Sequence, residues 1–438
     1  MIPTEHDSDA APAPSLVRAI GRWTLAALVL NSIIGSGIFG IPSDVARLVG
    51  GAGPIAYLIA AAGIGLIMGC FAEVGSQFGA AGGPYLYARV AYGRFMGLQM
   101  GWLALLVRLT SAAANANLFV VYLGQFYPAA TTPLPRAALL TALLGLLLVI
   151  NLRGVRGGAR LSNLFMAAKL LPLALFIFAG LALAGIQIPA PRADAGLGAW
   201  LTALLALVFA YGGFEAALIP MAEVQRPRRD TPFALFVALA SCALLYTAVH
   251  VVVMSALPDP ASSPRPVADA ARVFLGAGGA ALIAIGAMIS MAGYLSGQFV
   301  SAPRLPYALA QEGDFPAPFG AVHRRFRTPH IAILVYGLTV WALALYGSFI
   351  WNAILSAVAR LFTYALVCGA LLILRRRRPQ ADAYRLPAGP LVSVLGIAFS
   401  AALVATMGAQ ELAIVAATVL VALANWLWVR RRAARSAA

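Results

Sequence analysis

Twelve hydrophobic stretches, separated by short polar or basic segments, fill the sequence between Trp23 and Val429. A stretch of about 18 or more apolar residues is long enough to cross the hydrocarbon core of a bilayer as a helix. Only 11% of the 438 residues are charged, whereas a water-soluble domain carries about a quarter. The sequence therefore predicts an all-α membrane protein with twelve spans near 24–48, 54–79, 95–127, 136–152, 162–184, 198–222, 232–257, 270–302, 330–346, 350–374, 388–407 and 411–429.

The arginines indicate how these spans are oriented. If the amino terminus is cytoplasmic, the cytoplasmic loops hold most of them, and the opposite loops hold only Arg47, Arg136, Arg192 and Arg265. Loops rich in arginine and lysine stay on the cytoplasmic side of a membrane. We therefore expect a multi-pass protein of the cell inner membrane, with both termini in the cytoplasm. An odd number of spans would destroy this asymmetry, which supports twelve.

The formal net charge of +16 does not indicate a nucleic-acid partner, because the basic residues form short clusters between hydrophobic runs. Membrane lipid is the expected surrounding. The sequence has no metal-ligand spacing such as CxxC and no catalytic motif such as HExxH. We therefore expect a protein that binds no metal or cofactor and is not an enzyme. The chain divides into a disordered cytosolic tail (1–22), a core of ten spans (23–374), two peripheral spans (386–429) and a basic cytosolic tail (430–438).

Two spans contain glycine-rich interruptions at matching places. The first span holds Asn31 to Gly40 (NSIIGSGIFG), and the sixth holds Phe209 to Glu215 (FAYGGFE). Each glycine costs about 1 kcal/mol in a helix interior, and unwound backbone inside a bilayer is tolerated only where protein or a water-filled cavity satisfies it. Paired interruptions in two halves of a chain are the best sequence indication of a transporter's binding site. Close helix packing at small residues is the alternative interpretation.

Four stretches in the first ten spans resemble bacterial amino acid permeases of the amino acid–polyamine–organocation transporter superfamily. They are 34–39 (IGSGIF), 71–73 (FAE) with 82–87 (GGPYLY), 209–232, and 301–330. The resemblance implies a LeuT-like fold in which spans 1–5 (23–185) and 6–10 (198–374) form inverted repeats. Spans 1 and 6 are then the broken ones, and spans 11 and 12 are peripheral. It also implies secondary active transport of amino acids by alternating access.

A zwitterionic amino acid needs partners for both of its charged ends. The amides freed by the first-span interruption lie at the amino end of a half-helix, where the helix dipole favours a carboxylate. The carbonyls freed in the sixth span can accept hydrogen bonds from the ammonium group. In related permeases the aromatic residue at the Phe209 position covers the substrate as a gate, a role that the resemblance gives to Phe209. The expected contacts are with Ile34, Gly35, Ser36, Gly37, Phe209, Ala210, Tyr211 and Gly212.

Lys169 is the only lysine of the chain, and it lies inside the fifth predicted span. A charge at bilayer depth costs several kcal/mol, so it needs a partner or a function. In sodium-independent relatives a lysine at the matching position takes the place of a sodium ion. The resemblance therefore implies a coupling role for Lys169, with Ser290 of span eight as a candidate partner. The alternative is that Lys169 extends its ammonium group to the cytoplasmic interface.

Other polar residues in the spans are candidates for a function or for helix packing. Glu215 follows the sixth-span interruption and is a candidate for proton coupling or gating, whereas Glu73 lies where pairing with loop arginines is expected. Polar side chains in spans three and eight either line the side-chain pocket or join helices. These candidates are Asn115, Asn117 and Tyr294, and two further residues, Arg108 and Arg360, are interpreted as structural or gating arginines that face the bundle.

The cargo is less constrained than the fold. A polyamine or another organic cation would require acidic side chains in the cavity, and Glu215 is the only good candidate. We therefore expect an amino acid, with a neutral one favoured, although an arginine near the site would suit an acidic one. Lys169 in the cation position predicts transport without sodium. Proton-coupled symport and exchange both remain open, and the sequence does not indicate the oligomeric state.

Overall fold

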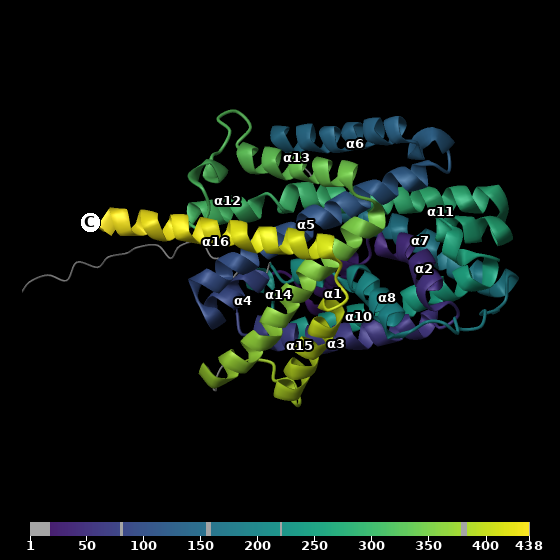
Figure 1. Cartoon of the computed structure of the whole chain (residues 1–438), viewed down its shortest axis with the longest axis horizontal. Helices are drawn as coiled ribbons and strands as arrows, with labels where there is room; N and C mark the ends of the chain where they lie inside the picture. The colour runs from purple at the N-terminus through teal and green to yellow at the C-terminus, as the bar shows by residue number, and fades with distance from the viewer. Residues whose placement is uncertain (1–17, 79–81, 155–158, 220, 378–382, 438) are drawn as a thin grey trace, which may run out of the picture.

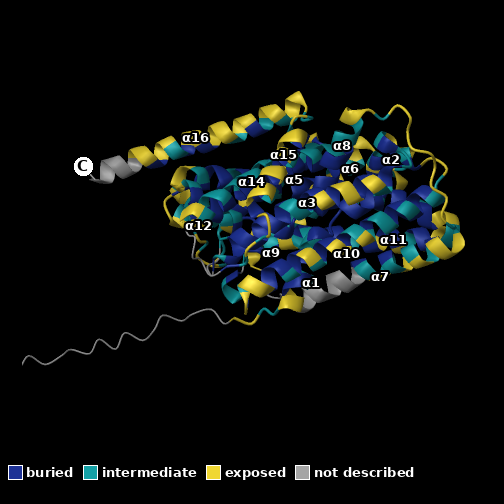
Figure 2. Ribbon diagram, turned by 90° about the horizontal axis from the view of Figure 1, so that it is seen from below, coloured by how far each residue is buried: buried dark blue, intermediate teal, exposed yellow. Residues whose placement is uncertain are grey.

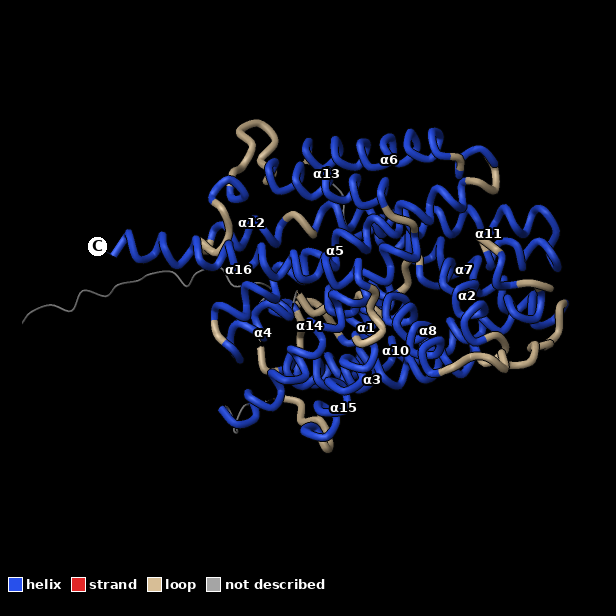
Figure 3. Tube along the Cα trace, in the orientation of Figure 1, coloured by secondary structure: helices blue, strands red, loops and turns tan. Residues whose placement is uncertain are grey.

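The computed structural model describes residues 18–78, 82–154, 159–219, 221–377 and 383–437 (Figure 1). Within these segments the chain forms sixteen α-helices joined by short connections, and no β-strand (Figure 3). The first eight helices are α1 (Arg22–Ile33), α2 (Gly37–Val49), α3 (Gly53–Ser76), α4 (Gly83–Tyr92), α5 (Arg94–Leu123), α6 (Pro133–Arg153), α7 (Ala159–Leu183) and α8 (Leu197–Tyr211). The others are α9 (Phe214–Ala217), α10 (Pro227–Ala256), α11 (Pro266–Ser301), α12 (Arg304–Gln311), α13 (His330–Tyr346), α14 (Phe349–Arg377), α15 (Gly389–Val404) and α16 (Ala409–Ala437).

Many of these helices are long and apolar enough to cross a bilayer. Eight candidate spans occur in the described chain, and α1 and α2 together form a ninth that is bent by 52°. There are also three shorter apolar helices, which are α13, α15 and the part of α7 from Lys169 to Leu183. The chain is therefore a multi-pass membrane protein. The expected total of twelve spans requires the bent pair and all three shorter helices to cross, and it stays a prediction.

Every predicted hydrophobic segment overlaps one or two of the observed helices. Some boundaries differ because a helix stops inside an apolar run. The third predicted span was expected near 95–127, but α5 ends at Leu123. The sixth was expected near 198–222, but α8 ends at Tyr211 and only the one-turn helix α9 follows. Hydropathy does not detect these ends, because the residues beyond them are also apolar.

The most buried helices form the centre of the bundle. In α3, α5 and α14, 67% of the most apolar window is buried inside the protein, compared with 11% in α6 and 22% in α16. α16 accordingly presents a largely exposed surface along the edge of the molecule (Figure 2). Because this exposed surface is apolar, α6 and α16 are suited to contact lipid, and the central helices surround the interrupted spans.

A buried carboxylate joins three segments of the bundle. Glu73 of α3 is fully buried, and its oxygens accept hydrogen bonds of 2.6 Å from both Nε and Nη2 of Arg375 in α14. The backbone amide of Leu386 donates to the same carboxylate over 2.8 Å. The pairing expected for Glu73 is thus present. A buried ion pair with this bidentate geometry fixes the relative position of the helices that carry it.

Ordered structure begins before the first predicted span. The amide of Ile20 donates to the carbonyl of Glu223 over 2.9 Å, and the amide of Gln225 donates back to Ile20 over 2.9 Å. The last residues of the predicted tail 1–22 are therefore ordered, whereas 1–17 lie outside the described residues. At the other end, α16 continues through the basic segment as far as Ala437.

Candidate functional site

The two interrupted spans meet inside the bundle. α1 ends at Ile33 and α2 begins at Gly37, whereas α8 ends at Tyr211 and α9 begins at Phe214. A Cβ atom added to Gly37 would lie 2.7 Å from Cα of Ala210. The first turn of α2 therefore packs directly on the last turn of α8. The missing side chain at Gly37 is what allows the two interruptions to lie in one place.

The glycines of the second interruption are required by close contacts. Gly213 has a φ of 111°, a conformation that glycine adopts without strain. A Cβ atom there would overlap the backbone carbonyl of Ser32 in α1. At Gly212 a Cβ atom would overlap the guanidinium group of Arg360 in α14. One glycine thus lets α9 approach α1, and the other makes room for an arginine.

A tyrosine of α10 connects the two interruptions. The hydroxyl of Tyr246 lies 3.3 Å from the carbonyl oxygen of Ile33 and 3.2 Å from that of Ala210. Both carbonyls are at helix ends, where no amide of the same helix reaches them. Tyr211, the last residue of α8, instead joins α8 to α3, because its hydroxyl donates to the carbonyl of Tyr57 over 3.1 Å. Protein groups therefore satisfy part of the unwound backbone, as a membrane interior requires.

Lys169 points inward to the end of α1. Its Nζ donates to the carbonyl of Asn31 over 3.1 Å and to that of Ile34 over 2.7 Å. The side chain is only 5% exposed, so it does not extend to the membrane interface. The carboxyl end of a helix carries partial negative charge, which favours an ammonium group there. A fixed cation thus links α7 to the interruption of the first span.

Glu215 is held by groups from its own turn and from α14. Arg360 Nε lies 3.0 Å from Oε1 of Glu215, and the hydroxyl of Tyr364 donates to Oε2 over 3.0 Å. The amide of Gly213 also donates to Oε2 over 3.0 Å. Arg360 is buried, with 3% of its surface exposed. The carboxylate therefore has two hydrogen-bond donors and one charged partner, and these contacts fix its position between α9 and α14.

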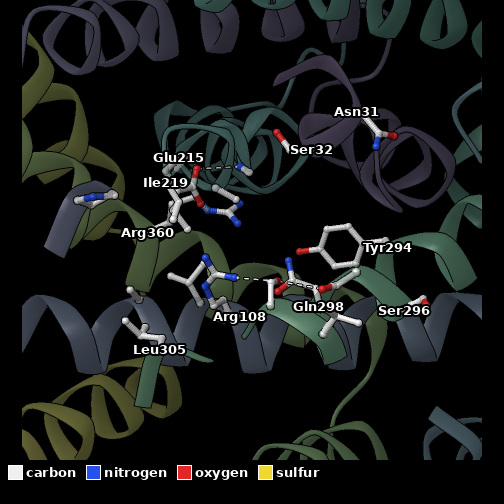
Figure 4. Close-up of a pocket in the computed structure, with 18 of the residues that line it drawn as sticks. Asn31, Ser32, Arg108, Glu215, Ile219, Tyr294, Ser296, Gln298, Leu305 and Arg360 are labelled. Atoms are coloured by element: carbon white, nitrogen blue, oxygen red, sulfur yellow. Dashed lines mark hydrogen bonds and ion pairs between the residues drawn. The ribbon is translucent and has the colours of Figure 1, made fainter. Parts of the chain in front are cut away.

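Two cavities adjoin this centre. The larger, of about 420 Å³, is lined by groups such as Ser32, Lys169, Glu215, Ser290 and Tyr294 (Figure 4). The smaller has a volume of only about 10 Å³ and lies at the interruptions themselves. Ser32, Tyr294 and Arg360 line both, so these three side chains form the wall between the cavities. A pocket that holds a small molecule has about 300–1,000 Å³, so only the larger cavity has room for one.

The structure gathers most of the residues expected at the site. Seven of them line the small cavity and four line the large cavity, and Tyr294 lines both. Three atoms of this group, Ser36 Oγ, Asn115 Oδ1 and Ser290 Oγ, are buried without a hydrogen-bond partner among the described residues. Buried polar atoms of this kind are usually satisfied. The two sets are Gly35, Ser36, Gly37, Asn115, Phe209, Gly212 and Tyr294, and then Lys169, Ser290, Glu215 and Tyr294.

The other expected residues lie beside the cavities rather than on their walls. Ile34 contributes its carbonyl to Lys169, and Ala210 contributes its carbonyl to Tyr246. Asn117 is turned to α6, where its Oδ1 accepts a hydrogen bond of 2.6 Å from Nη2 of Arg136. It therefore joins helices, which is the alternative that polar residues in spans allow.

Sequence reasoning did not identify Tyr246, Tyr364 or Ser32 as parts of the site. One signal was available for Tyr364, because it follows Arg360 by four residues and so lies on the same helix face. An arginine and a tyrosine on one face of an apolar helix indicate a shared polar partner, which is Glu215 here. For Tyr246 and Ser32 there is no such signal, because their contacts depend on how α1, α8 and α10 pack.

A polar network holds the mouth of the large cavity. Tyr85 of α4 lines the cavity and donates to Oδ2 of Asp314 over 3.0 Å. Arg89 pairs with Glu312, and Nε of Arg94 donates to Asp314 over 2.6 Å. Burial, together with the charge of Asp314, raises the pKa of Tyr85. Tyr85 therefore stays protonated, and α4 stays joined to the segment after α12.

Comparison with known proteins identifies the family to which the chain belongs. The family model described as amino acid permease matches residues 20–426. The chain belongs to this amino acid permease family. The match extends over almost the whole described chain, and the resemblance seen in the sequence is thereby confirmed. As a permease, the protein is a transporter and not an enzyme.

Several curated relatives of this permease are bacterial transporters of similar length. The methylthioribose transporter of Bacillus subtilis (strain 168) is 28% identical, over 90% of this chain and 89% of the relative. The serine/threonine exchanger SteT of the same organism is 30% identical, over 88% of this chain and 90% of the relative. The branched-chain amino acid permease BcaP of Bacillus subtilis (strain 168) is 26% identical, over 90% of this chain and 89% of the relative. Each is a similar protein, and its name gives a different cargo from those of the other two.

Proposed function

We propose that this permease carries amino acids across the cytoplasmic membrane by alternating access and without sodium. The observation that carries the proposal is the position of Lys169, whose Nζ bonds to the carbonyls of Asn31 and Ile34 beside the first interruption. An ammonium group at this place supplies the positive charge that a bound cation would supply. The named relatives that transport or exchange amino acids support the choice of cargo.

The substrate's carboxylate would bind to the amides at the start of α2, between Gly35 and Gly37. The first amides of a helix have no acceptor within it, and the helix dipole favours an anion there. The ammonium group would bind to carbonyls at the end of α8, near Phe209. Phe209 lines the small cavity and packs edge-to-face on Phe349 at 6.0 Å, which fits the gating role. The unpartnered oxygen of Asn115 is then available to the side chain of the substrate.

The two cavities suggest which state of the transport cycle the structure represents. The small cavity at the interruptions is too small for an amino acid, whereas the large one reaches Tyr85 in α4 and Leu305 in α12. α4 and α12 lie at the end of the molecule where α16 ends (Figure 1). The distribution of arginines in the sequence predicts that this end faces the cytoplasm, together with both termini. We therefore propose an inward-facing state with a closed central site.

The proposed architecture is based on the two interrupted spans and on the contact between them. Twelve spans, two inverted five-span repeats and two peripheral spans would place the two interruptions at equivalent positions. The direct packing of Gly37 on Ala210 supports this, because it puts both half-helix ends at one site. Substrate exchange and proton symport are both compatible with it. Neither coupling mode is favoured by the contacts of Glu215, which has an arginine as its counter-charge.

The alternative cargo is a polyamine or another organic cation carried on the same fold. Such a cargo needs an acidic side chain that is free to bind it. Glu215 is the acidic residue that lines the large cavity in the described chain, and Arg360 already neutralises it. The cavity therefore favours a zwitterion over a cation.

Thermal unfolding of the detergent-purified protein tests the cargo. We expect an amino acid, and not putrescine or spermidine, to raise the melting temperature in a panel of the twenty amino acids and these polyamines. A ligand that binds only the folded state stabilises it by about 2.7 kcal/mol at 100 times its Kd. Stabilisation by the polyamines alone would reject the amino acid proposal and move the protein to the organic-cation alternative.

A further inference from the structure

Arg108 is a cation of the large cavity that forms no ion pair with a carboxylate of the described residues. It lies near the midpoint of α5, and its guanidinium group points into the cavity (Figure 4). Its Nη1 is 3.4 Å from Oγ of Ser301, which is neutral. Among the ion pairs of the described residues, none includes Arg108. An arginine within a membrane span is costly and normally has a partner or a function.

The other charges of the cavity are already engaged. Lys169 is bound to two backbone carbonyls, and Arg360 is paired with Glu215. At the mouth, Asp314 is held by Arg94 and by Tyr85. Of the described side chains that line the cavity, three are cationic and one is anionic, which leaves an excess of positive charge. A counter-ion for Arg108 must therefore come from outside the described residues, and the ligand is the obvious source.

A neutral acceptor lies near Arg108. Gln298 of α11 also lines the cavity, and its Oε1 is buried without a hydrogen-bond partner in the described part of the chain. It lies three residues before Ser301, on the same face of the helix, and Ser301 is the group that Arg108 contacts. An arginine next to a free amide oxygen supplies one site for a carboxylate and one for an ammonium group.

We propose that Arg108 and Gln298 form a second substrate subsite in the large cavity. Arg108 binds a carboxylate of the amino acid between the central interruptions and the cavity mouth, and Gln298 accepts a hydrogen bond from its ammonium group. The positive charge of Arg108 also disfavours amino acids with cationic side chains. This inference rests on the proposed transport of amino acids and adds the substrate class that the cavity selects.

The volumes explain why the subsite lies in the large cavity. The space at the interruptions, about 10 Å³, holds no amino acid, whereas about 420 Å³ next to Arg108 does. Tyr294 and Arg360 line both spaces, so a molecule bound at Arg108 waits directly outside the closed site. A purely gating role for Arg108 would require an acidic partner at the mouth. The acids there, Glu312 and Asp314, are paired with other arginines.

Ligand-induced melting shifts of variants test the subsite. The probes are L-leucine, L-serine, L-glutamate and L-lysine, and the variants are Arg108→Gln, Arg108→Lys and Gln298→Leu. Arg272→Gln is the matched control, because Arg272 is an exposed arginine of α11 that does not line the cavity. We expect Arg108→Gln to raise the apparent Kd of the stabilising amino acids at least 10-fold, and Arg108→Lys to keep it within 3-fold. Gln298→Leu should raise it at least 3-fold, and Arg272→Gln should leave it unchanged.

The same probes identify which carboxylate is bound. If Arg108→Gln binds only L-glutamate more weakly than wild type, Arg108 contacts the side-chain carboxylate. If it also binds neutral amino acids more weakly, Arg108 contacts the α-carboxylate. In both cases we expect L-lysine to stabilise Arg108→Gln but not the wild-type protein. Folded Arg108→Gln that binds the probes with wild-type Kd and still excludes L-lysine would overturn the subsite.

The outcomes separate this inference from the proposed function. If no amino acid stabilises the wild-type protein, the proposed function is rejected. If amino acids stabilise the wild-type protein and Arg108→Gln equally, only the subsite is rejected. Should Arg108→Gln fail to fold, Arg108→Lys decides, because a charge-binding role predicts retained affinity. A structural role of the planar guanidinium group predicts its loss.

Discussion

Replacing Lys169 with methionine is expected to lower amino acid uptake into proteoliposomes by about 100-fold, which corresponds to about 2.7 kcal/mol. The ammonium group donates to the carbonyls of Asn31 and Ile34, and each hydrogen bond to a charged group contributes about 1.5–3 kcal/mol. Methionine has a similar length but no charge and no donor. The carbonyls at the interruption would then be free to adopt other arrangements, and the first amides of α2 would no longer be aligned for a carboxylate.

Folding is expected to survive this substitution, because methionine is well accommodated in an apolar interior. The melting temperature of Lys169→Met should lie within a few degrees of wild type, whereas its ligand-induced shift should become smaller, because binding at the interruptions is lost and the subsite at Arg108 remains. Arg272→Met, which removes an exposed arginine of α11, is the control for loss of positive charge and should transport normally. Uptake of Lys169→Met at the wild-type rate would contradict a coupling role and leave the lysine a structural one.

Replacing Gly213 with alanine is expected to abolish substrate binding at the interruptions. The residue has a φ of 111°, which costs a non-glycine residue about 1–3 kcal/mol. The added Cβ would also overlap the backbone carbonyl of Ser32, which cannot rotate away as a side chain can. The sixth-span interruption must therefore move away from α1. We expect uptake to fall at least 100-fold and the ligand-induced melting shift to become smaller.

Gly145→Ala is the matched control for this prediction. Gly145 lies in the largely exposed helix α6, and apart from the neighbouring backbone of that helix no heavy atom lies within 4 Å of the Cβ that the substitution adds. Alanine is favoured over glycine in a helix by about 1 kcal/mol, so this variant should be at least as stable as wild type and fully active. Normal uptake by Gly213→Ala would show that the contact between the interruptions is not needed for transport.

The sequence predicts the helices well because hydropathy is a local property. Each apolar run contains the residues that make one helix compatible with the lipid interior, so every predicted segment overlaps an observed helix. The interruptions were also predictable, because the glycines that cause them are adjacent in the chain. The end of α8 at Tyr211 lies inside an apolar run, so its position depends on Gly212 and Gly213 rather than on hydropathy.

The partners within the site were harder to predict because they are distant in the chain. Lys169 could be identified as unusual from the sequence, but its acceptors lie in α1. Glu215 was a candidate for proton coupling or gating because it follows the sixth-span interruption, whereas its pairing with Arg360 depends on how α14 packs against α9. Asn117 illustrates the same limit, because the sequence allowed it either to line the side-chain pocket or to join helices. Its bond to Arg136 depends on how α6 lies against α5.

Uptake of the stabilising amino acid into proteoliposomes, measured with sodium and with choline as the external cation, tests the central claim most directly. The claim is that an amino acid permease uses the ammonium group of Lys169 in place of a sodium ion. The account predicts saturable uptake at the same rate in both salts. Uptake that requires sodium, or that rises several-fold when sodium replaces choline, would contradict it.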